Sequence, residues 1–137
     1  MIRVVFDTNI LFSAIYKKTG IPAQVLDFVT AGVLTPCISD PVMEEYEDVL
    51  TRPVLREHAS RVKEVLAYLR QLAVYVKPIQ ELDCCSDPDD NRFLECAHAS
   101  GAVYLVTGNA RHFPKTYAGT TIVTPRTLLD RLLQHKI

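Results

Sequence analysis

The chain has 137 residues, which matches the usual size of one domain, and a composition of 48% hydrophobic and 23% charged residues is ordinary for a globular protein. This composition excludes a disordered chain, and the formal net charge of −1 excludes the strong overall positive field that many nucleic-acid-binding proteins carry. We therefore predict a single domain over residues 1–137, in which any contact with nucleic acid is made by local basic residues.

The longest apolar stretches end well before the roughly 18 residues that a membrane span needs. The N-terminal sequence "MIRVVFDTN" lacks the long apolar region of a signal peptide, so we expect a cytoplasmic protein with no membrane partner. The cysteines and histidines show neither metal-ligand spacing nor a disulfide framework, so we predict reduced thiols, surface or capping histidines and no zinc site. These residues are Cys37, Cys84, Cys85, Cys96, His58, His98, His112 and His135.

Apolar runs alternate with amphipathic segments along the chain. The run at residues 2–6 is β-branched and aromatic without alternation, which indicates a strand buried on both faces of a parallel sheet. We predict strands at residues 2–6, 35–39, 73–78, 102–107 and 120–124. We predict helices at residues 8–18, 22–32, 42–50, 60–72, 88–100 and from Pro125 onward. This order predicts an α/β fold with a central, mainly parallel sheet and helices on both faces, whose ligand sites lie beyond the carboxyl ends of the strands.

Small polar residues follow three of the predicted strands. They are Asp7, the pair Ser39-Asp40, and the triplet Thr107-Gly108-Asn109. A carboxylate directly after a fully apolar strand is partly desolvated unless a cation or hydrogen-bond donors meet it. We therefore favour a functional role for Asp7, with capping of the next helix as the alternative.

The helix predicted at 42–50 carries four acids, and its apolar stripe sorts them. The stripe consists of Val42, Met43, Tyr46, Val49 and Leu50. Glu44 and Asp48 lie opposite the stripe and should face solvent. Glu45 and Glu47 lie on its two borders, and Glu45 is nearer the helix start and the strand ends. We prefer Glu45 as a site residue and keep Glu47 as the alternative.

The segment "DPDDNRF", residues 87–93, places three acids at the start of a predicted helix. Asp87 fits the N-cap, because proline follows it at the first helical position, and Asp90 fits the acid position of a capping box. Asp89 complements the helix dipole. Asp90 also precedes apolar residues at spacings of three, four and seven, so its side chain should point inward.

Three acids from separate segments, Asp7, Glu45 and Asp90, would repel one another at one edge of a sheet without a cation. Carboxylate and water oxygens form the environment that Mg²⁺ or Mn²⁺ prefers, whereas zinc more often brings His or Cys. The pattern therefore favours Mg²⁺ or Mn²⁺ as the cofactor.

Four segments resemble, in order, the successive blocks of the PIN-domain family, specifically its small prokaryotic branch described as toxins of VapBC-like toxin–antitoxin pairs. The segments are "VVFDTNILFSA", "ISDPVMEEYEDVLTRP", "DPDDNRFLECAHASGAVYLVTGNARHFP" and "IVTPRTLL", and together they cover nearly the whole chain. The resemblance implies a three-layer α/β/α fold with a central, mainly parallel five-stranded sheet in the order 3-2-1-4-5. It also implies a metal-dependent ribonuclease with an acidic site at the carboxyl edge of that sheet.

The resemblance assigns roles residue by residue. Asp7 matches the first acid of the family, with Thr8 and Asn9 as polar support. Glu45 matches the acid of the second block, and Asp90 matches the third acid, which leads into a helix.

The fourth acidic position of the family is Asn109 in this chain. An amide oxygen can coordinate a metal but supplies no charge, so Asn109 would be a weak ligand and a second metal would bind less tightly. This departure argues against two tightly bound metals.

The reaction implied is hydrolysis of RNA phosphodiester bonds, with Mg²⁺ or Mn²⁺ held by Asp7 and Asp90 and by Glu45 directly or through water. Thr107 and Ser39 are expected to hydrogen-bond the carboxylates or the phosphate. The candidates for contacts with the RNA backbone are Lys17, Arg92 and Arg111. The implied partners are the RNA substrate, a small antitoxin protein and a second copy of the chain in a homodimer.

Two alternatives remain beside the ribonuclease. The fold could serve as an RNA-binding or assembly module whose metal site is weakened by Asn109. A phosphotransfer or phosphatase domain is less favoured, because "FDTN" lacks the D-x-D pair and no lysine follows the strand at 102–107.

Overall fold

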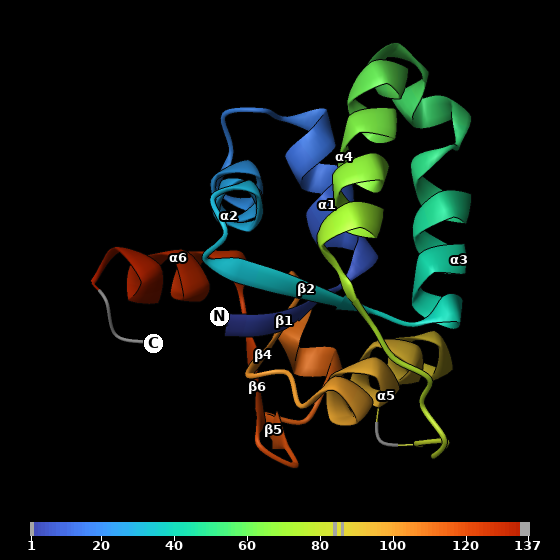
Figure 1. Ribbon diagram of the computed structural model, residues 1–137, viewed down its shortest axis with the longest axis vertical. Coiled ribbons are helices and arrows are strands. Elements are labelled where there is room, and N and C mark those ends of the chain that lie inside the picture. Colours follow the sequence, from blue (N-terminus) through green and yellow to red (C-terminus); the bar gives the residue numbers. More distant parts are fainter. Residues whose placement is uncertain (1, 84, 86, 135–137) are drawn as a thin grey trace.

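The computed structural model describes residues 2–83, 85 and 87–134 (Figure 1). The strands are β1 (Ile2–Phe6), β2 (Leu34–Ile38), β3 (Val74–Tyr75), β4 (Tyr104–Val106), β5 (Thr116–Tyr117) and β6 (Thr120–Val123). The α-helices are α1 (Thr8–Tyr16), α2 (Ile21–Thr30), α3 (Asp40–Leu50), α4 (Ala59–Leu72), α5 (Asn91–Ser100) and α6 (Pro125–Leu133). Short 3₁₀ turns are η1 (Pro53–His58), η2 (Pro88–Asp90) and η3 (Ala110–His112). The predicted strands and helices are present, with ends that shift by a few residues.

The strands form one sheet in the order β3-β2-β1-β4-β6-β5. The five predicted strands are parallel to one another, and β6 is the fifth of them, so the expected order 3-2-1-4-5 is confirmed. The sheet has a sixth strand, β5, which pairs antiparallel with β6. Its two-residue turn places Ala118 and Gly119 at positive φ, as tight hairpins require, but the pair lacks the usual Asn-Gly or Asp-Gly signal. The sequence predicted no strand between residues 107 and 120, so β5 was missed.

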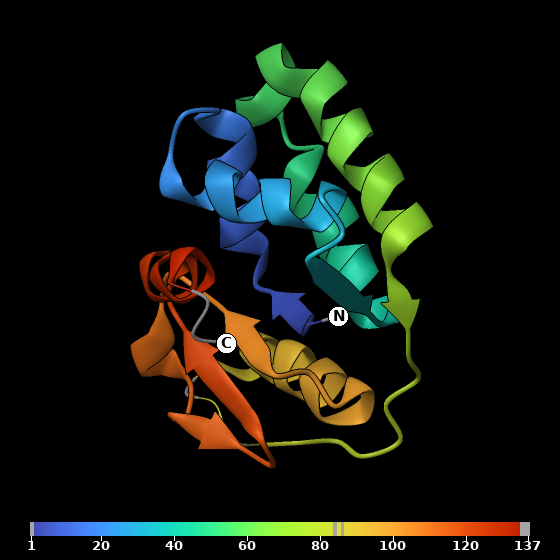
Figure 2. The ribbon, with the colours of Figure 1, turned by 60° about the vertical axis from the view of Figure 1, so that its left-hand side comes forward.

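Helices cover both faces of the sheet, which confirms the three-layer α/β/α architecture. In the two ribbon views α1, α2 and α4 lie on one side of the sheet and α5 lies on the other (Figures 1 and 2). Helix α6 packs against α2. Among the described residues, the buried hydrophobic side chains form one core cluster. None of the helices in the described ranges has the length and apolar character needed to cross a bilayer.

Strand β1 is central, and its position explains where polar groups gather. Val4, Val5 and Phe6 are buried, as expected for a strand covered on both faces. The sheet continues from β1 to β2 on one side and to β4 on the other, so strand order reverses here. Ligand sites of parallel sheets form at such reversals, beyond the carboxyl ends of the strands. The residues directly after β1 and β4, Asp7 and Thr107, lie at this point.

Candidate functional site

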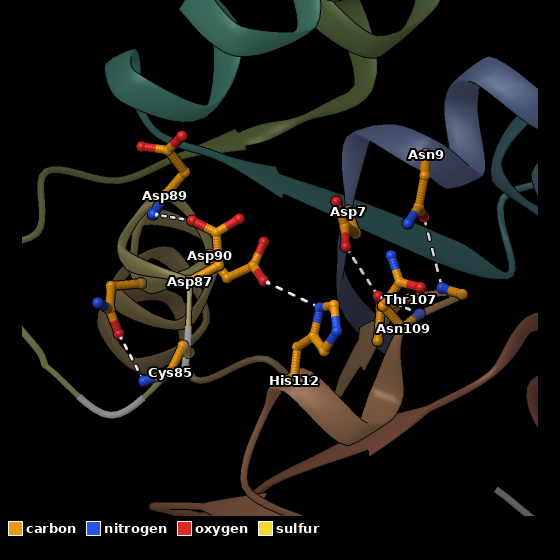
Figure 3. Close-up of polar contacts among 11 residues, drawn as sticks. Asp7, Asn9, Cys85, Asp87, Asp89, Asp90, Thr107, Asn109 and His112 are labelled. Carbon is orange, nitrogen blue, oxygen red and sulfur yellow. Dashed lines mark hydrogen bonds and ion pairs between the residues drawn. The ribbon is translucent and has the colours of Figure 1, made fainter.

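Asp7 lies at the carboxyl end of β1 with only 6% of its surface exposed. Its backbone begins α1, and the backbone N–H groups of Asn9 and Thr8 in that helix help to stabilise the charged carboxylate. Its Oδ2 also accepts a 2.7 Å hydrogen bond from the Thr107 hydroxyl (Figure 3). The carboxylate therefore does more than cap α1, because it also contacts the residue that follows the neighbouring strand.

Burial raises the pKa of the Asp7 carboxyl above its ordinary value. The Thr107 hydrogen bond, the nearby backbone of Asn9 and Thr8 and the His112 imidazole oppose this rise, in that order. Asp7 is thus a desolvated carboxylate whose charged form depends on donors around it.

One further hydrogen bond closes the turn after β4, and another holds this turn against the start of α1. The buried Thr107 hydroxyl also accepts from the backbone N–H of Asn109 at 3.0 Å. The Asn9 side chain accepts from the backbone N–H of Gly108 at 3.4 Å. Thr107 and Asn9 therefore fix this turn, which leaves the Asn109 side chain exposed beside Asp7 (Figure 3).

The anchoring of α3 to the end of β1 places Glu45 near Asp7. The neighbouring Tyr46 is buried, and its hydroxyl donates a 2.5 Å hydrogen bond to the carbonyl oxygen of Phe6, the last residue of β1. Glu45 is half-buried, and its Oε2 accepts a hydrogen bond from the Thr8 hydroxyl. Glu47 is exposed and pairs with Arg70 at 3.4 Å, so Glu45 is the α3 border acid that lies beside the end of β1.

Asp90 lies at the junction between η2 and α5. Asp87 caps this segment, with its Oδ1 accepting from the backbone N–H of Asp89 at 3.0 Å. Asp90 makes no capping hydrogen bond of its own, so the predicted capping box was wrong, because the first turn is a 3₁₀ turn with shorter spacing. Its side chain is 15% exposed, and its Oδ2 lies 3.9 Å from His112 Nδ1. Asp89 is exposed, as predicted.

The three acids interact electrostatically across the space between their elements. Burial raises the pKa of Glu45, and the charges of Asp7, Asp89 and Asp87 raise it further against the Thr8 hydrogen bond. The pKa of Asp90 rises to about 6, first through burial and then through Asp7 and Asp87, while His112 lowers it. The charge of Asp7 therefore reaches both Glu45 and Asp90.

These oxygens are hard donors of the type that Mg²⁺ and Mn²⁺ prefer. Within residues 2–83, 85 and 87–134, no three His, Cys, Asp or Glu side chains are already arranged to hold one ion together. Mg²⁺ keeps several waters and commonly takes only one or two protein carboxylates directly, so the donor set fits such an ion. The types of donor atom are therefore compatible with a hydrated divalent cation.

Other predicted residues occupy different surroundings. The Ser39 hydroxyl caps α3 by accepting from the Val42 N–H, and Ser39 is 1% exposed, so its contact with a carboxylate or a phosphate stays a prediction. Lys17 follows the last residue of α1, at the far end of this helix from Asp7. Arg92 lies on α5 and pairs with Glu95 at 3.5 Å.

His112 is the group in this region that the sequence did not identify. It ends η3, next to the exposed Arg111, and it lies near both Asp90 and Asp7. The only signal was its place three residues after Asn109, in the segment that follows a strand end. The prediction that His112 is merely a surface or capping residue was incomplete for that reason.

The remaining cysteines and histidines lie elsewhere. Cys37 and Cys96 are buried free thiols, as predicted, and Cys85 is also buried. His58 packs against Tyr16, and His98 against Tyr117. Cys84 and His135 lie outside the described residues.

Comparison with known proteins connects this geometry to a family. A family model described as "PIN domain" matches residues 3–111. The chain is 30% identical over 111 residues to "Uncharacterized protein MJ1680" of Methanocaldococcus jannaschii, covering 79% of this chain and 71% of that protein.

Two solved structures share the fold. One is VapBC2 from Rickettsia felis bound to a DNA fragment from their promoter, with a TM-score of 0.60 and 18% identity over 90% of this chain and 98% of that chain. The other is DNA-bound VapBC from Salmonella typhimurium, with a TM-score of 0.61 and 16% identity over 91% of this chain and 99% of that chain.

Proposed function

The chain belongs to the PIN-domain family, and on this premise we propose that it is a Mg²⁺- or Mn²⁺-dependent endoribonuclease. The observation that carries the proposal is the convergence of Asp7, Glu45 and Asp90 from β1, α3 and the start of α5. Each has a raised pKa; the charge of Asp7 contributes to the rise for Glu45, and the charges of Asp7 and Glu45 contribute to the rise for Asp90. A cation relieves such repulsion, and an acidic cluster without one would only destabilise the fold.

The chain's own residues would prepare the site for hydrolysis. Thr107 holds the Asp7 carboxylate in place and favours its charged form, and Thr8 does the same for Glu45. Asp7 and Asp90 would bind the cation, with Glu45 binding it directly or through water. Glu45 or Asp7 would also orient the attacking water and accept its proton. The divalent ion, when bound, would help to ionise the water and neutralise charge that develops on the phosphate.

We also propose that the protein is the toxin of a toxin–antitoxin pair. The support is the shared fold with the VapBC structures, to which the chain aligns over nine-tenths of its length. The partner would be a small antitoxin protein that binds the folded chain and inhibits cleavage. A homodimer stays a prediction from the same resemblance.

The test is incubation of purified protein with structured and unstructured RNAs, with Mn²⁺ and with EDTA, beside an Asp90→Asn variant. We expect endonucleolytic products with Mn²⁺ that are absent with EDTA and in the variant. Cleavage by Asp90→Asn at the wild-type rate would rule out the proposed site. RNA binding without any metal-dependent cleavage would favour the binding-module alternative, in which Asn109 has weakened the site.

A further inference from the structure

We propose that His112 binds the phosphate that undergoes cleavage, on the side of the site where Asn109 replaces a fourth acid. The inference rests on the proposed function, and it adds a substrate-binding residue to the three acids. The imidazole would donate an N–H hydrogen bond to a phosphate oxygen, and the site would work with one divalent ion.

The first support is the position of the ring. The imidazole Nδ1 lies 3.9 Å from Asp90 Oδ2, and Figure 3 shows the ring between Asp90 and the turn that carries Thr107 and Asn109. The side chain is 40% exposed, so an RNA strand can reach it. The contact with Asp90 is longer than a hydrogen bond, so a small rotation can present an N–H to a phosphate without breaking a hydrogen bond between these two residues.

The second support is that the backbone holds His112 at this place. The His112 N–H donates a 2.9 Å hydrogen bond to the Asn109 carbonyl oxygen, which closes the η3 turn. The next residue, Phe113, is buried in the core. The turn therefore connects Asn109 to the buried Phe113, and the imidazole of His112 projects from between these two residues.

The third support is charge. A phosphodiester brings a negative charge to a region that already contains Asp7, Glu45 and Asp90. One divalent ion cannot offset all of these charges, and Asn109 offers no negative charge to hold a second ion. His112 interacts favourably with the charged forms of both Asp7 and Asp90, so it lies where an additional donor would meet the substrate.

The chemistry favours phosphate over metal as the partner of His112. Imidazole suits zinc, copper, nickel and iron, whereas Mg²⁺ and Mn²⁺ prefer carboxylate and water oxygens. The Asp90 carboxylate has two oxygens, so it can bind the cation with one and remain near the imidazole with the other. His112 would then act on the substrate, with Asp90 keeping the ring oriented.

The test compares His112→Gln and His112→Ala with a matched control, His98→Gln, which changes an exposed histidine on α5 that contacts Tyr117. Mn²⁺ binding is measured by calorimetry, and binding of a short fluorescent RNA is measured by anisotropy with Ca²⁺ in place of Mn²⁺. We expect a single Mn²⁺ per chain in every protein, with a dissociation constant that changes less than about twofold. We expect both His112 variants, and not His98→Gln, to bind the RNA about tenfold more weakly, with a fall in kcat as well as a rise in KM.

Three results would overturn the inference. A tenfold loss of Mn²⁺ affinity in both His112 variants would make His112 a metal ligand. Two tightly bound Mn²⁺ ions in the wild type would contradict a site that works with one ion and needs the imidazole to bind the phosphate. RNA affinity equal to that of His98→Gln would exclude a phosphate contact. If the wild type cleaves no RNA, the proposed function fails, and the anisotropy measurement still decides on His112.

Discussion

Thr107 and Asp7 lie 100 residues apart in the chain, and the Thr107 hydroxyl donates a 2.7 Å hydrogen bond to the Asp7 carboxylate. The two residues directly follow the neighbouring parallel strands β1 and β4, where the strand order of the sheet reverses. The bond orients a carboxylate that burial would otherwise tend to neutralise.

Replacing Thr107 with valine should therefore weaken metal binding. The substitution keeps the shape of the side chain but leaves Asp7 without its hydroxyl donor and the Asn109 N–H without its acceptor. Loss of a residue that orients a ligand typically lowers metal affinity or activity by about 10–100-fold. Calorimetric titration with Mn²⁺ measures the effect, and Thr107→Ser, which retains the hydroxyl, should bind nearly as the wild type does. Wild-type affinity in Thr107→Val would show that the hydrogen bond does not support the site.

Tyr46→Phe should lower stability. The change removes the 2.5 Å hydrogen bond to the Phe6 carbonyl oxygen and leaves that buried acceptor unpaired. Such a loss costs about 1–3 kcal/mol of unfolding free energy. Because Tyr46 ties α3 to the end of β1 and its ring packs against Phe93 of α5, the metal affinity should fall too.

Urea denaturation measures the change in stability. The matched control is Tyr75→Phe, which removes a hydroxyl from a tyrosine on β3 that is 51% exposed and should change stability by less than about 0.5 kcal/mol. Equal effects of the two substitutions would contradict the role of Tyr46 as an anchor.

Regular periodicity explains why most of the fold was predictable from the sequence. The apolar residues Val4, Val5 and Phe6 of β1 and the glycine at positive φ that ends α5 are local signals that identify these elements. The β5–β6 hairpin was missed because Ala118 adopts positive φ without the usual turn residue, so its conformation depends on the strands around it. The strands predicted at 73–78 and 102–107 were longer than β3 and β4 are in the structure. Pairing with neighbouring strands, rather than composition, decides where a strand ends.

The candidate site was predictable to the extent that it follows helix faces and strand ends. Glu45 was distinguished from Glu47 by its position on the border of the α3 stripe and its closeness to the helix start. Ser39 could not be sorted in this way, because a strand-end hydroxyl can cap a helix or face a ligand, and here it caps α3. His112 depends on the η3 turn bringing it to Asp90, which no local periodicity indicates.

Glu45→Gln and Glu47→Gln form a matched pair on the same helix. Glu45 would bind the cation or orient the attacking water, so its neutral isostere should reduce Mn²⁺-dependent RNA cleavage by about 100-fold or more. Glu47 is exposed and forms an ion pair with exposed Arg70, so its substitution should leave cleavage unchanged and stability within about 1 kcal/mol. Initial cleavage rates at saturating Mn²⁺ provide the measurement. Similar losses in both variants would mean that the sorting of these acids is wrong.

Asp90→Asn should stabilise the metal-free protein at neutral pH while removing its response to metal. The pKa of Asp90 is raised from 3.8 to about 6 in the folded protein, because burial and then Asp7 and Asp87 disfavour the charged carboxylate. Between these two values the folded state binds more protons than the unfolded state, so this group's contribution to stability falls as pH rises through that range. At pH 7.5 the neutral amide avoids the penalty, which is on the order of 1–3 kcal/mol.

Urea denaturation in EDTA at pH 4 and pH 7.5 tests this expectation. The gain of Asp90→Asn over the wild type should be present at pH 7.5 and largely absent at pH 4, where the wild-type carboxyl approaches its neutral form. Added Mn²⁺ should raise the stability of the wild type, because it binds only the folded state, and should leave the variant nearly unchanged. Asp89→Asn, which alters an exposed acid in the same turn, should show neither effect. A variant that is less stable than the wild type by the same amount at both pH values would show that the buried charge at Asp90 is already compensated without metal.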